Sequence, residues 1–386
     1  MIAPSRNGTA SAGLAEALRA IAASAGDRDR DPRGRFPEAA VAALERAGAL
    51  AGTAGTYADE LRLLRAVAGA DAGVGRILDG HLNAVERLRV QAPAALRDAE
   101  LALVAAGRLR AGVWGADPGD GEGPPAWLDG ATISGVKTFC SGAGGLHRAL
   151  VLVRDAAADG PPLAAWVDLT APGTVEIDRS WFRAAGMRSS ASHRVIFTAA
   201  PVLAILGDPG ALTEQPWFAR DAVRTAATWV GAADAATTDA LTWLATREPI
   251  SDLEALAAGR LETWRHGLGL WLDDAGHALD ADPTARALDG DADAAARTLD
   301  AGATTRSLDA DPAPRDPALV AAQLRAAVAD GARAILDEAE RATGSRPPTT
   351  GATLDRAARD LRLFLLQHRL EPILARAGRA RLEARR

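Results

Sequence analysis

Residues 135–144 read Gly-Val-Lys-Thr-Phe-Cys-Ser-Gly-Ala-Gly, and residues 186–197 read Gly-Met-Arg-Ser-Ser-Ala-Ser-His-Arg-Val-Ile-Phe. The first segment continues a short extended run into a glycine-rich turn, and it holds Lys137, the only lysine of the chain. The second leads from a loop rich in hydroxyl groups into an alternating strand whose Val195 and Phe197 share one face. Both segments therefore predict a strand joined to an irregular turn.

The composition is that of a soluble globular protein. A chain of 386 residues suggests two or three packed units, and its 48% hydrophobic and 24% charged residues are ordinary for that class. The net charge of −6 and the scattered basic residues argue against a nucleic-acid surface. The single cysteine, Cys140, excludes an intramolecular disulfide. With no apolar run near the ~18 residues of a membrane span and no signal-peptide core, we expect a cytoplasmic protein outside any membrane.

The hydrophobic pattern divides the chain into three regions. Apolar residues recur at helical spacing from Leu14 to about residue 108, and the helical period returns from Trp217. Between them, short β-type runs are separated by Gly, Pro and Asp. We therefore expect an N-terminal helical domain, a central β domain and a C-terminal helical domain, at residues 1–110, 111–208 and 209–386.

Six runs in the middle region are expected to be strands, at residues 113–115, 131–136, 149–154, 164–168, 175–177 and 195–198. Residues 280–315 are rich in Asp, Ala and Pro, which predicts a solvated insertion in the third domain. This stretch lacks the complete pattern of a calcium-binding loop, and the six histidines lack the paired spacing of zinc ligands. The sequence therefore predicts no metal site.

The order of these regions and the motifs within them resemble the acyl-CoA dehydrogenase family of flavoproteins. Where that family has Thr-Glu-Pro-Gly-x-Gly, residues 116–121 read Ala-Asp-Pro-Gly-Asp-Gly. The family motif Gly-x-Lys-x-Trp-Ile-Thr-Asn-Gly is matched from Gly135, with Phe139 for Trp and Ser141 for Thr. A third motif, Gly-x-Arg-x-Ser-x-Thr before a strand, is matched from Gly186. The resemblance covers about residues 10–280 and 316–380.

This resemblance implies an α+β fold in which an antiparallel β domain lies between N-terminal helices and a C-terminal four-helix bundle. It also implies FAD as the cofactor. An isoalloxazine ring needs a flat apolar wall, which Phe139 offers, and donors at its edge, which Ser141 and backbone N–H groups offer. The resemblance assigns phosphate contacts to Ser190 and to Arg247, the latter toward a neighbouring subunit. The full set of expected cofactor contacts is Asp117, Phe139, Cys140, Ser141, Ser190, Arg247 and Glu254.

The family's catalytic base is not found at its usual place. Dehydrogenation of an acyl thioester needs a carboxylate that removes the α-proton. In the family this glutamate follows an Arg-Asp pair, and here the corresponding position after Arg359 and Asp360 is His368. Two other carboxylates stand near family base positions: Asp221, on the helix that leads to Gly231, and Glu371, one turn beyond His368.

A histidine at this position resembles the oxygenase branch of the same superfamily, in which reduced flavin reacts with O2 near a histidine. The ordinary histidine pKa near 6.5 suits proton exchange at neutral pH. The main expectation is an FAD-dependent dehydrogenase acting on an acyl or acyl-CoA-like substrate, with His368 and Asp221 as catalytic candidates. The alternatives are a monooxygenase that uses reduced FMN or FAD, and a non-catalytic protein of this fold.

Partners and neighbouring residues follow from the same resemblance. A dehydrogenase of this family passes electrons to an electron-transfer flavoprotein, an oxygenase receives reduced flavin from a reductase, and either is expected to form a homodimer or homotetramer. We expect His193 to be exposed at the start of its strand and Cys140 to be a packing residue. Trp181, which precedes Gly186, is expected in the core, with the mouth of the active site as the alternative.

Overall fold

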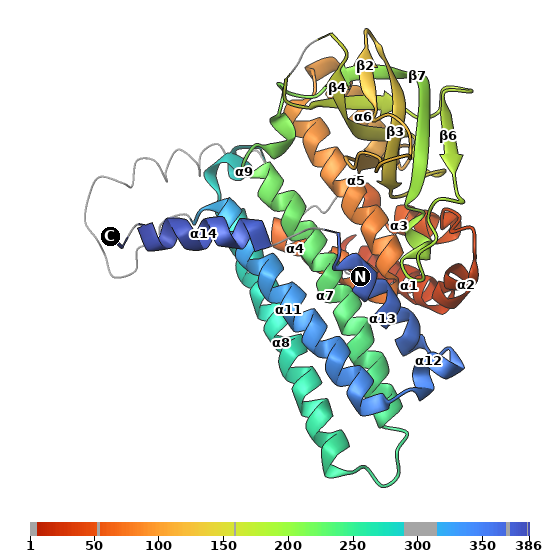
Figure 1. The fold of residues 1–386 in the computed structure, drawn as a ribbon, viewed down its shortest axis with the longest axis vertical. Helices are drawn as coiled ribbons and strands as arrows, with labels where there is room; N and C mark the ends of the chain where they lie inside the picture. Colours follow the sequence, from red (N-terminus) through yellow and green to blue (C-terminus); the bar gives the residue numbers. More distant parts are fainter. Residues whose placement is uncertain (1–5, 52–54, 158–159, 289–314, 368–370, 384) are drawn as a thin grey trace, which may run out of the picture.

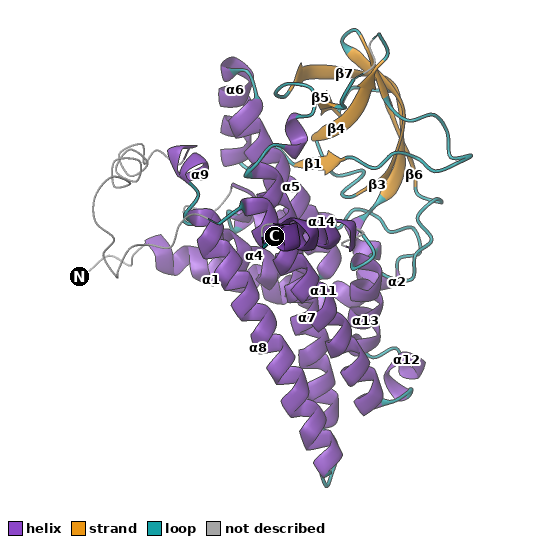
Figure 2. Cartoon of the chain, turned by 60° about the vertical axis from the view of Figure 1, so that its left-hand side comes forward, coloured by secondary structure: helices purple, strands orange, loops and turns teal. Residues whose placement is uncertain are grey.

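The computed structural model of the chain describes residues 6–51, 55–157, 160–288, 315–367, 371–383 and 385–386. The strands gather at one end of the molecule, and the long helices of the C-terminal half extend to the other end (Figure 1). Turned by 60°, the molecule shows a helical body with the β domain beside its upper part (Figure 2). The predicted order of helices, strands and helices is confirmed.

The N-terminal part is entirely helical. Asp59 and Thr56 form a capping box at the start of one long helix, and Asp71 caps the next. Such caps satisfy the backbone N–H groups of a first helical turn, which fixes where each helix begins. The elements are α1 (Arg6–Ala23), α2 (Ala25–Arg30), α3 (Glu38–Arg46), η1 (Ala49–Ala51), α4 (Tyr57–Ala70), α5 (Ala72–Gln91) and α6 (Ala94–Ala105).

The β domain is a seven-stranded sheet that curls around its own apolar core. Its strands are β1 (Ala111–Trp114), β2 (Trp127–Asp129), β3 (Thr132–Cys140), β4 (Arg148–Asp155), β5 (Leu163–Asp168), β6 (Val175–Asp178) and β7 (His193–Ile205). All six predicted runs overlap strands, whereas β2 was not predicted. Most pairings are antiparallel, but β1 and β2 both pair with β4 in parallel. The connection from β1 to β4 is long enough for such a crossover.

The C-terminal part is a bundle of α7 (Trp217–Leu244), α8 (Asp252–Asp280), α11 (Pro317–Thr343) and α13 (Thr353–Phe364). The short helices α9 (Pro283–Leu288), α12 (Arg346–Thr350) and α14 (Glu371–Glu383) accompany it. Of the predicted insertion at 280–315, residues 289–314 lie outside the described residues. Within the described part of the chain, no helix is long and apolar enough to cross a membrane.

Small residues allow the helices to pack closely. A Cβ atom added to Gly231 of α7 would stand 2.1 Å from the carbonyl oxygen of Arg65 on α4, so only glycine fits there. The same holds at Gly73 in the first turn of α5, where a Cβ would stand 2.2 Å from the Ser189 hydroxyl. The short helix η2 (Arg188–Ser190) is thus pressed against the start of α5.

We expect Gly73→Ala to lower the free energy of unfolding by about 1–3 kcal/mol, the usual cost of inserting a methyl group into a filled contact. Urea denaturation of both proteins measures this difference. The matched control is Gly259→Ala in α8, where an added Cβ meets no atom within 4 Å. This control is expected to gain up to about 1 kcal/mol from the better helix propensity of alanine. Equal stability of the two variants would contradict the close contact at Gly73.

Candidate functional site

The first of the two sequence segments is anchored by a buried lysine. Lys137 is 1% exposed, and its ammonium group donates to Asp117 Oδ1 at 2.7 Å and to the carbonyl oxygen of Gly115 at 3.3 Å. Next to it, the Thr138 hydroxyl donates to the carbonyl oxygen of Asp117. The loop after β1 is therefore bound to the end of β3, and two of the motifs lie together.

Phe139 presents an aromatic ring to the surface of this site. It is 57% exposed, and its backbone has a φ of +51°, which bulky side chains rarely adopt. Its ring meets the edge of Trp181 at a centroid distance of 4.8 Å. Trp181 is held in turn by Glu122, whose carboxylate accepts from the indole nitrogen at 2.6 Å. An exposed aromatic side chain on a strained, well-supported backbone fits a surface for a flat ligand.

Three serines from the two segments form a hydroxyl cluster behind Phe139. The Ser141 and Ser192 hydroxyls are 2.9 Å apart, and those of Ser190 and Ser192 are 2.7 Å apart. The Ser190 hydroxyl also bonds the carbonyl oxygen of Met187, and Ser190 is only 1% exposed. The Ser190 hydroxyl is thus already bonded within the cluster. Its expected contact with a phosphate stays a prediction.

A buried carboxylate, Asp71, connects the second segment to the helices. Its side chain accepts the N–H groups of Gly73 and Val74, the Ser189 hydroxyl at 2.6 Å and the guanidinium of Arg28 at 2.7 Å. These contacts fix η2 at the N-terminal end of α5. Nothing in the sequence around Asp71 distinguished it from an ordinary helix cap.

Helix α13 holds the second segment from the other side. Asp360 accepts the backbone N–H of Met187, and Gly186 lies so close to the Arg359 carbonyl that a Cβ would be 2.3 Å from its oxygen. Arg359 itself pairs with Asp29 at 2.7 Å. Burial, together with the charge of Asp71, raises the pKa of Asp360 to about 7. The Arg-Asp pair that precedes His368 therefore holds the second segment in place.

The structure does not bring Asp221 to the serine cluster. Its carboxylate accepts from Arg87 at 2.6 Å, near the C-terminal end of α5, whereas the cluster adjoins Gly73 at the start of that helix. Fourteen residues of α-helix separate Gly73 from Arg87, about 21 Å at 1.5 Å per residue. Burial raises the pKa of Asp221 to about 7 against the attraction of Arg87. Whether Asp221 acts in catalysis remains a prediction.

Arg247 and Glu254 lie at the turn between α7 and α8, the end of the bundle opposite the β domain (Figure 1). They approach each other at 3.7 Å, and Glu254 also completes the capping box of Ser251 at the start of α8. They are therefore remote from Phe139 in one copy of the chain, and a contact with a cofactor would have to come from a second copy.

Cys140 and His193 are both part of the interior. Cys140 is fully buried, and burial raises the pKa of its thiol well above the ordinary value, so it is a packing residue as expected. The expected exposure of His193 is wrong. His193 is fully buried, and its Nε2 is 2.8 Å from the carbonyl oxygen of Gly34, because the loop before α3 covers the start of β7. His368 and the side chain of Glu371 lie outside the described residues.

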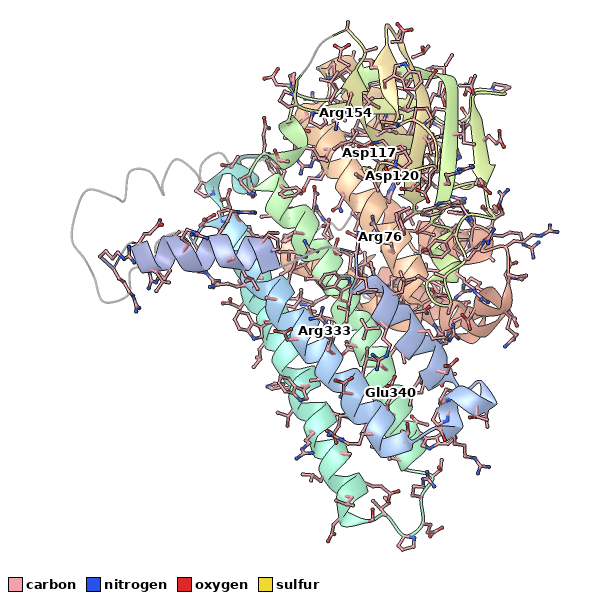
Figure 3. The ribbon with its side chains drawn as sticks, viewed as in Figure 1. Arg76, Asp117, Asp120, Arg154, Arg333 and Glu340 are labelled. Atoms are coloured by element: carbon pink, nitrogen blue, oxygen red, sulfur yellow. The ribbon has the colours of Figure 1, made fainter. Side chains whose placement is uncertain are left out.

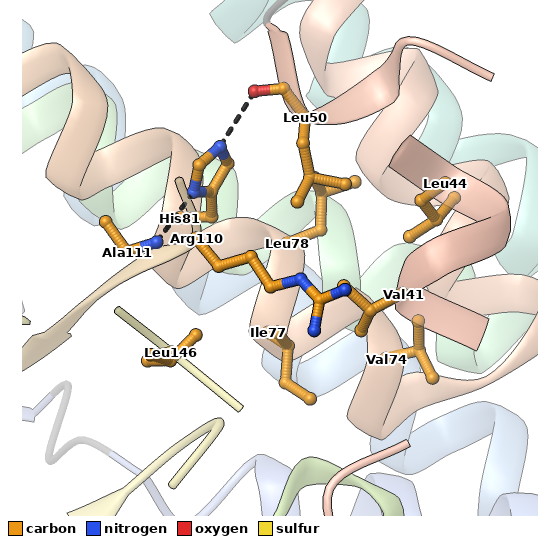
Figure 4. A pocket seen from close by; sticks show the side chains of 10 residues that line it. All are labelled: Val41, Leu44, Leu50, Val74, Ile77, Leu78, His81, Arg110, Ala111 and Leu146. Carbon is orange, nitrogen blue, oxygen red and sulfur yellow. Dashed lines mark hydrogen bonds between the residues drawn. The ribbon is translucent and has the colours of Figure 1, made fainter. Parts of the chain in front are cut away.

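Two hollows described in the structure lie away from Phe139. One, of about 10 Å³, lies among α3, α5 and β1, where His81 joins the carbonyl of Leu50 to the N–H of Ala111 (Figure 4). It has room for about one water molecule and no cofactor. The other, of about 500 Å³, opens between α4, α7 and α13 beside Arg65 and Arg356. No cluster of metal-binding side chains occurs among the described residues.

Sequence reasoning missed several residues that shape this site. Glu122 orients Trp181, and its second carboxylate oxygen accepts the N–H of Gly119 at 2.7 Å. Trp181 is half-buried beside Phe139 and not in the core as expected, and its place at an active-site mouth stays a prediction. Glu122 directly follows the glycine-rich loop at 116–121, which could have indicated a role in the site. A single glutamate at such a place, however, is usually a solvated surface residue.

The whole chain is similar to several solved structures. TdsC from Paenibacillus sp. A11-2, a dibenzothiophene monooxygenase solved with FMN and indole, matches 97% of this chain and 98% of its own at 19% identity and a TM-score of 0.74. Methanesulfinate monooxygenase MsuC from Pseudomonas fluorescens matches 100% and 98% at 18% identity and 0.76. Butyryl-CoA dehydrogenase from Megasphaera elsdenii matches 99% of both chains at 16% identity and 0.75. The chain has the acyl-CoA dehydrogenase fold.

The acyl-CoA dehydrogenase fold is thus established by structure and not by sequence. No protein-family model matches the chain. No curated protein matches it either. Within this fold, the loop of Asp117 is bonded to the end of β3, and Asp360 of α13 is bonded to the second segment.

The raised pKa of Asp360 predicts a pH-dependent stability. Because the unfolded carboxyl ionises near pH 3.8 and the folded one near 7, wild-type stability should fall as the pH rises between these values. Asp360→Asn retains an acceptor for the Met187 N–H but does not titrate. Relative to the wild type, the variant should therefore gain about 4 kcal/mol of unfolding free energy between pH ~4 and ~7, since each pKa unit corresponds to ~1.4 kcal/mol. Above pH ~7 the difference should stay constant. Urea unfolding across this range measures it, and a constant difference would contradict the assignment.

Proposed function

We propose that the protein is a flavin-dependent monooxygenase, which binds reduced FMN or FAD supplied by a separate reductase and acts on a small molecule with O2. The observation that supports it most is the arrangement around Phe139. An exposed ring, in edge contact with Trp181 and near the hydroxyls of Ser141 and Ser192, fits one wall of an isoalloxazine site. The solved monooxygenases of the same fold favour the same reading.

The residues of this chain have distinct roles in the proposed site. Phe139 supports the ring, the Ser141 hydroxyl offers a donor at its edge, and Lys137 holds the loop of Asp117 in place. A reduced flavin, when bound, supplies the electrons that activate O2. His368 is proposed to exchange a proton during that reaction, for which an imidazole is suited near neutral pH. The buried serines exclude water on the protein side.

The dehydrogenase reading, with FAD and an acyl-CoA-like substrate, is the second candidate, favoured by the similarity to butyryl-CoA dehydrogenase. It requires a carboxylate beside the flavin. Asp221 is bonded to Arg87 about 21 Å along α5 from Gly73, at 1.5 Å per residue. This distance disfavours Asp221 as that base, and the side chain of Glu371, the other candidate, lies outside the described residues. The monooxygenase needs neither carboxylate and is therefore preferred. A flavin-free structural role is the third reading.

We also propose that the protein forms a homodimer or homotetramer through α8. The outer side of this helix exposes large apolar side chains, which a second copy would cover. Exposed fractions are 46% for Trp264 and 44% for Trp271, and the other residues of this face are Leu253, Leu256 and Leu270. Such an assembly would bring Arg247 of one copy toward the neighbouring copy of the chain.

Flavin binding is the first test. We expect the purified protein to bind reduced or oxidised FMN or FAD, measured by quenching of flavin fluorescence. Phe139→Ala should weaken binding by about 1 kcal/mol, close to fivefold, through the lost stacking contact. The matched control is Phe218→Ala, an exposed phenylalanine on α7 with 43% of its surface free, which should bind as the wild type does. A protein that takes up neither flavin would instead support the non-catalytic reading.

The role of His368 separates the two enzymatic readings. In the wild type, the rate at which O2 reoxidises bound reduced flavin should change with pH around ~6.5, the ordinary histidine pKa. His368→Ala should abolish this pH dependence, whereas Asp221→Asn should leave it. Stopped-flow absorbance measures the rate. Anaerobic bleaching of bound FAD by an acyl-CoA, lost in Asp221→Asn and retained in His368→Ala, would overturn the monooxygenase proposal in favour of the dehydrogenase.

A further inference from the structure

Arg325 is a buried arginine whose charge the described protein does not neutralise. It lies on α11, is 6% exposed, and its guanidinium carbon is 5.0 Å from the ring centre of Trp229 on α7. Among the described residues, neither its Nε nor its Nη2 has a hydrogen-bond partner. The indole N–H of Trp229, also fully buried, has none there either. Three unpartnered donors thus occur where α11 meets α7.

The neighbouring arginines of the interior are paired. Arg76 pairs with Asp79 at 2.8 Å, Arg87 with Asp221 at 2.6 Å, Arg220 with Glu86 at 2.6 Å, and Arg224 with Glu60 at 2.5 Å and with Glu86 at 2.7 Å. Asp79 attracts Arg325 through space. Its oxygens, however, accept from Arg76, Asn83 and Thr225. Arg325 therefore remains without a bonded carboxylate in the described part of the chain.

An unpaired cation is unfavourable inside a protein, and so is a donor without an acceptor. Burial lowers the pKa of Arg325 to about 10, so the guanidinium still carries its charge at neutral pH. A hydrophobic residue of similar size would fit such a place at lower cost. The position of an arginine here is best explained by an acceptor outside the described residues, and a bound ligand would supply one.

Arg325 is connected to the second segment through side chains of α7 and α13. Trp229 packs edge-on against Phe364 at a centroid distance of 6.2 Å, and Phe364 is one turn of α13 beyond Asp360, which holds Met187. On the other side, Arg76 is one turn of α5 beyond Gly73. Figure 3 shows Arg76 on the same face of the molecule as Asp117. A buried charge therefore begins this chain of contacts, whereas a hydrocarbon ligand would need apolar walls.

We propose that Arg325 binds an oxyanion of the substrate, a carboxylate or sulfonate group, with the indole N–H of Trp229 as a second donor. That the anion belongs to the substrate rests on the proposed function, whereas the anion site itself does not. Guanidinium groups suit such ligands because their N–H donors match the geometry of two oxygens. The substrate class that follows is a small organic acid, and a long neutral acyl chain would leave all three donors unpaired.

The test uses the flavin-free full-length protein and three probes, namely benzoate, benzenesulfonate and the neutral benzamide, at about 10 mM, above a millimolar Kd. Ionic strength is matched with sodium chloride. Benzoate or benzenesulfonate should raise the melting temperature, since a ligand that binds the folded state stabilises it. Benzamide should not. Arg325→Met should abolish the response, and Asp79→Asn should strengthen it by removing a competing negative charge.

The matched control is Arg333→Met, on the same helix but half-exposed and paired with Asp330, which should respond as the wild type does. If Arg325→Met fails to fold, Arg325→Lys retains the charge without the paired donors and should respond at least tenfold more weakly. The proposal is overturned if the wild type does not distinguish the anions from benzamide, or if an Arg325 variant responds fully. An anion response without flavin binding would overturn only the proposed function. Flavin binding without an anion response would overturn only the anion site.

Discussion

The carboxylate of Asp71 is the point on which the arrangement of the site depends. It is 2% exposed and accepts from two backbone N–H groups of α5, from the Ser189 hydroxyl and from Arg28 of α2. A buried carboxylate is stable only when several donors surround it, so these groups must converge. Since Ser189 belongs to the same turn as the serine cluster, the capping of one helix also positions the wall of the site.

Local chemistry explains what the sequence could predict. Glycine, lysine and hydroxyl residues predicted the turns of the two segments, because turns are determined by neighbouring residues. That Phe139, Ser141 and Ser190 share one region was implied by the resemblance to the acyl-CoA dehydrogenase family. The strand β2 has only three residues, too few for an alternating pattern. The contacts of Asp71 and Asp360 with the second segment span 118 and 173 residues. A lone aspartate on a helix gives no sign of such a partner, so the scaffold of the site could not be predicted.

The interior of the helical part contains a network of buried ion pairs. Between α4, α5 and α7, Arg224 bonds both Glu60 and Glu86, and the guanidinium of Arg220 lies 3.9 Å from the ring centre of Tyr57. Ion pairs of this kind contribute less to stability than to the choice of one packing, because each unpaired member is costly. They also restrict what enters the interior, since an apolar ligand would separate partners that it cannot replace.

Because the chain has a single lysine, cleavage at that residue can be used to measure how often the β domain opens. Lys137 is 1% exposed and bonded to Asp117, so the folded chain offers a lysine-specific protease no accessible cleavage site. Cleavage after this residue requires β3 to separate from the loop that carries Asp117. The rate of that one cut therefore reports how often the site opens by itself, independently of the helices.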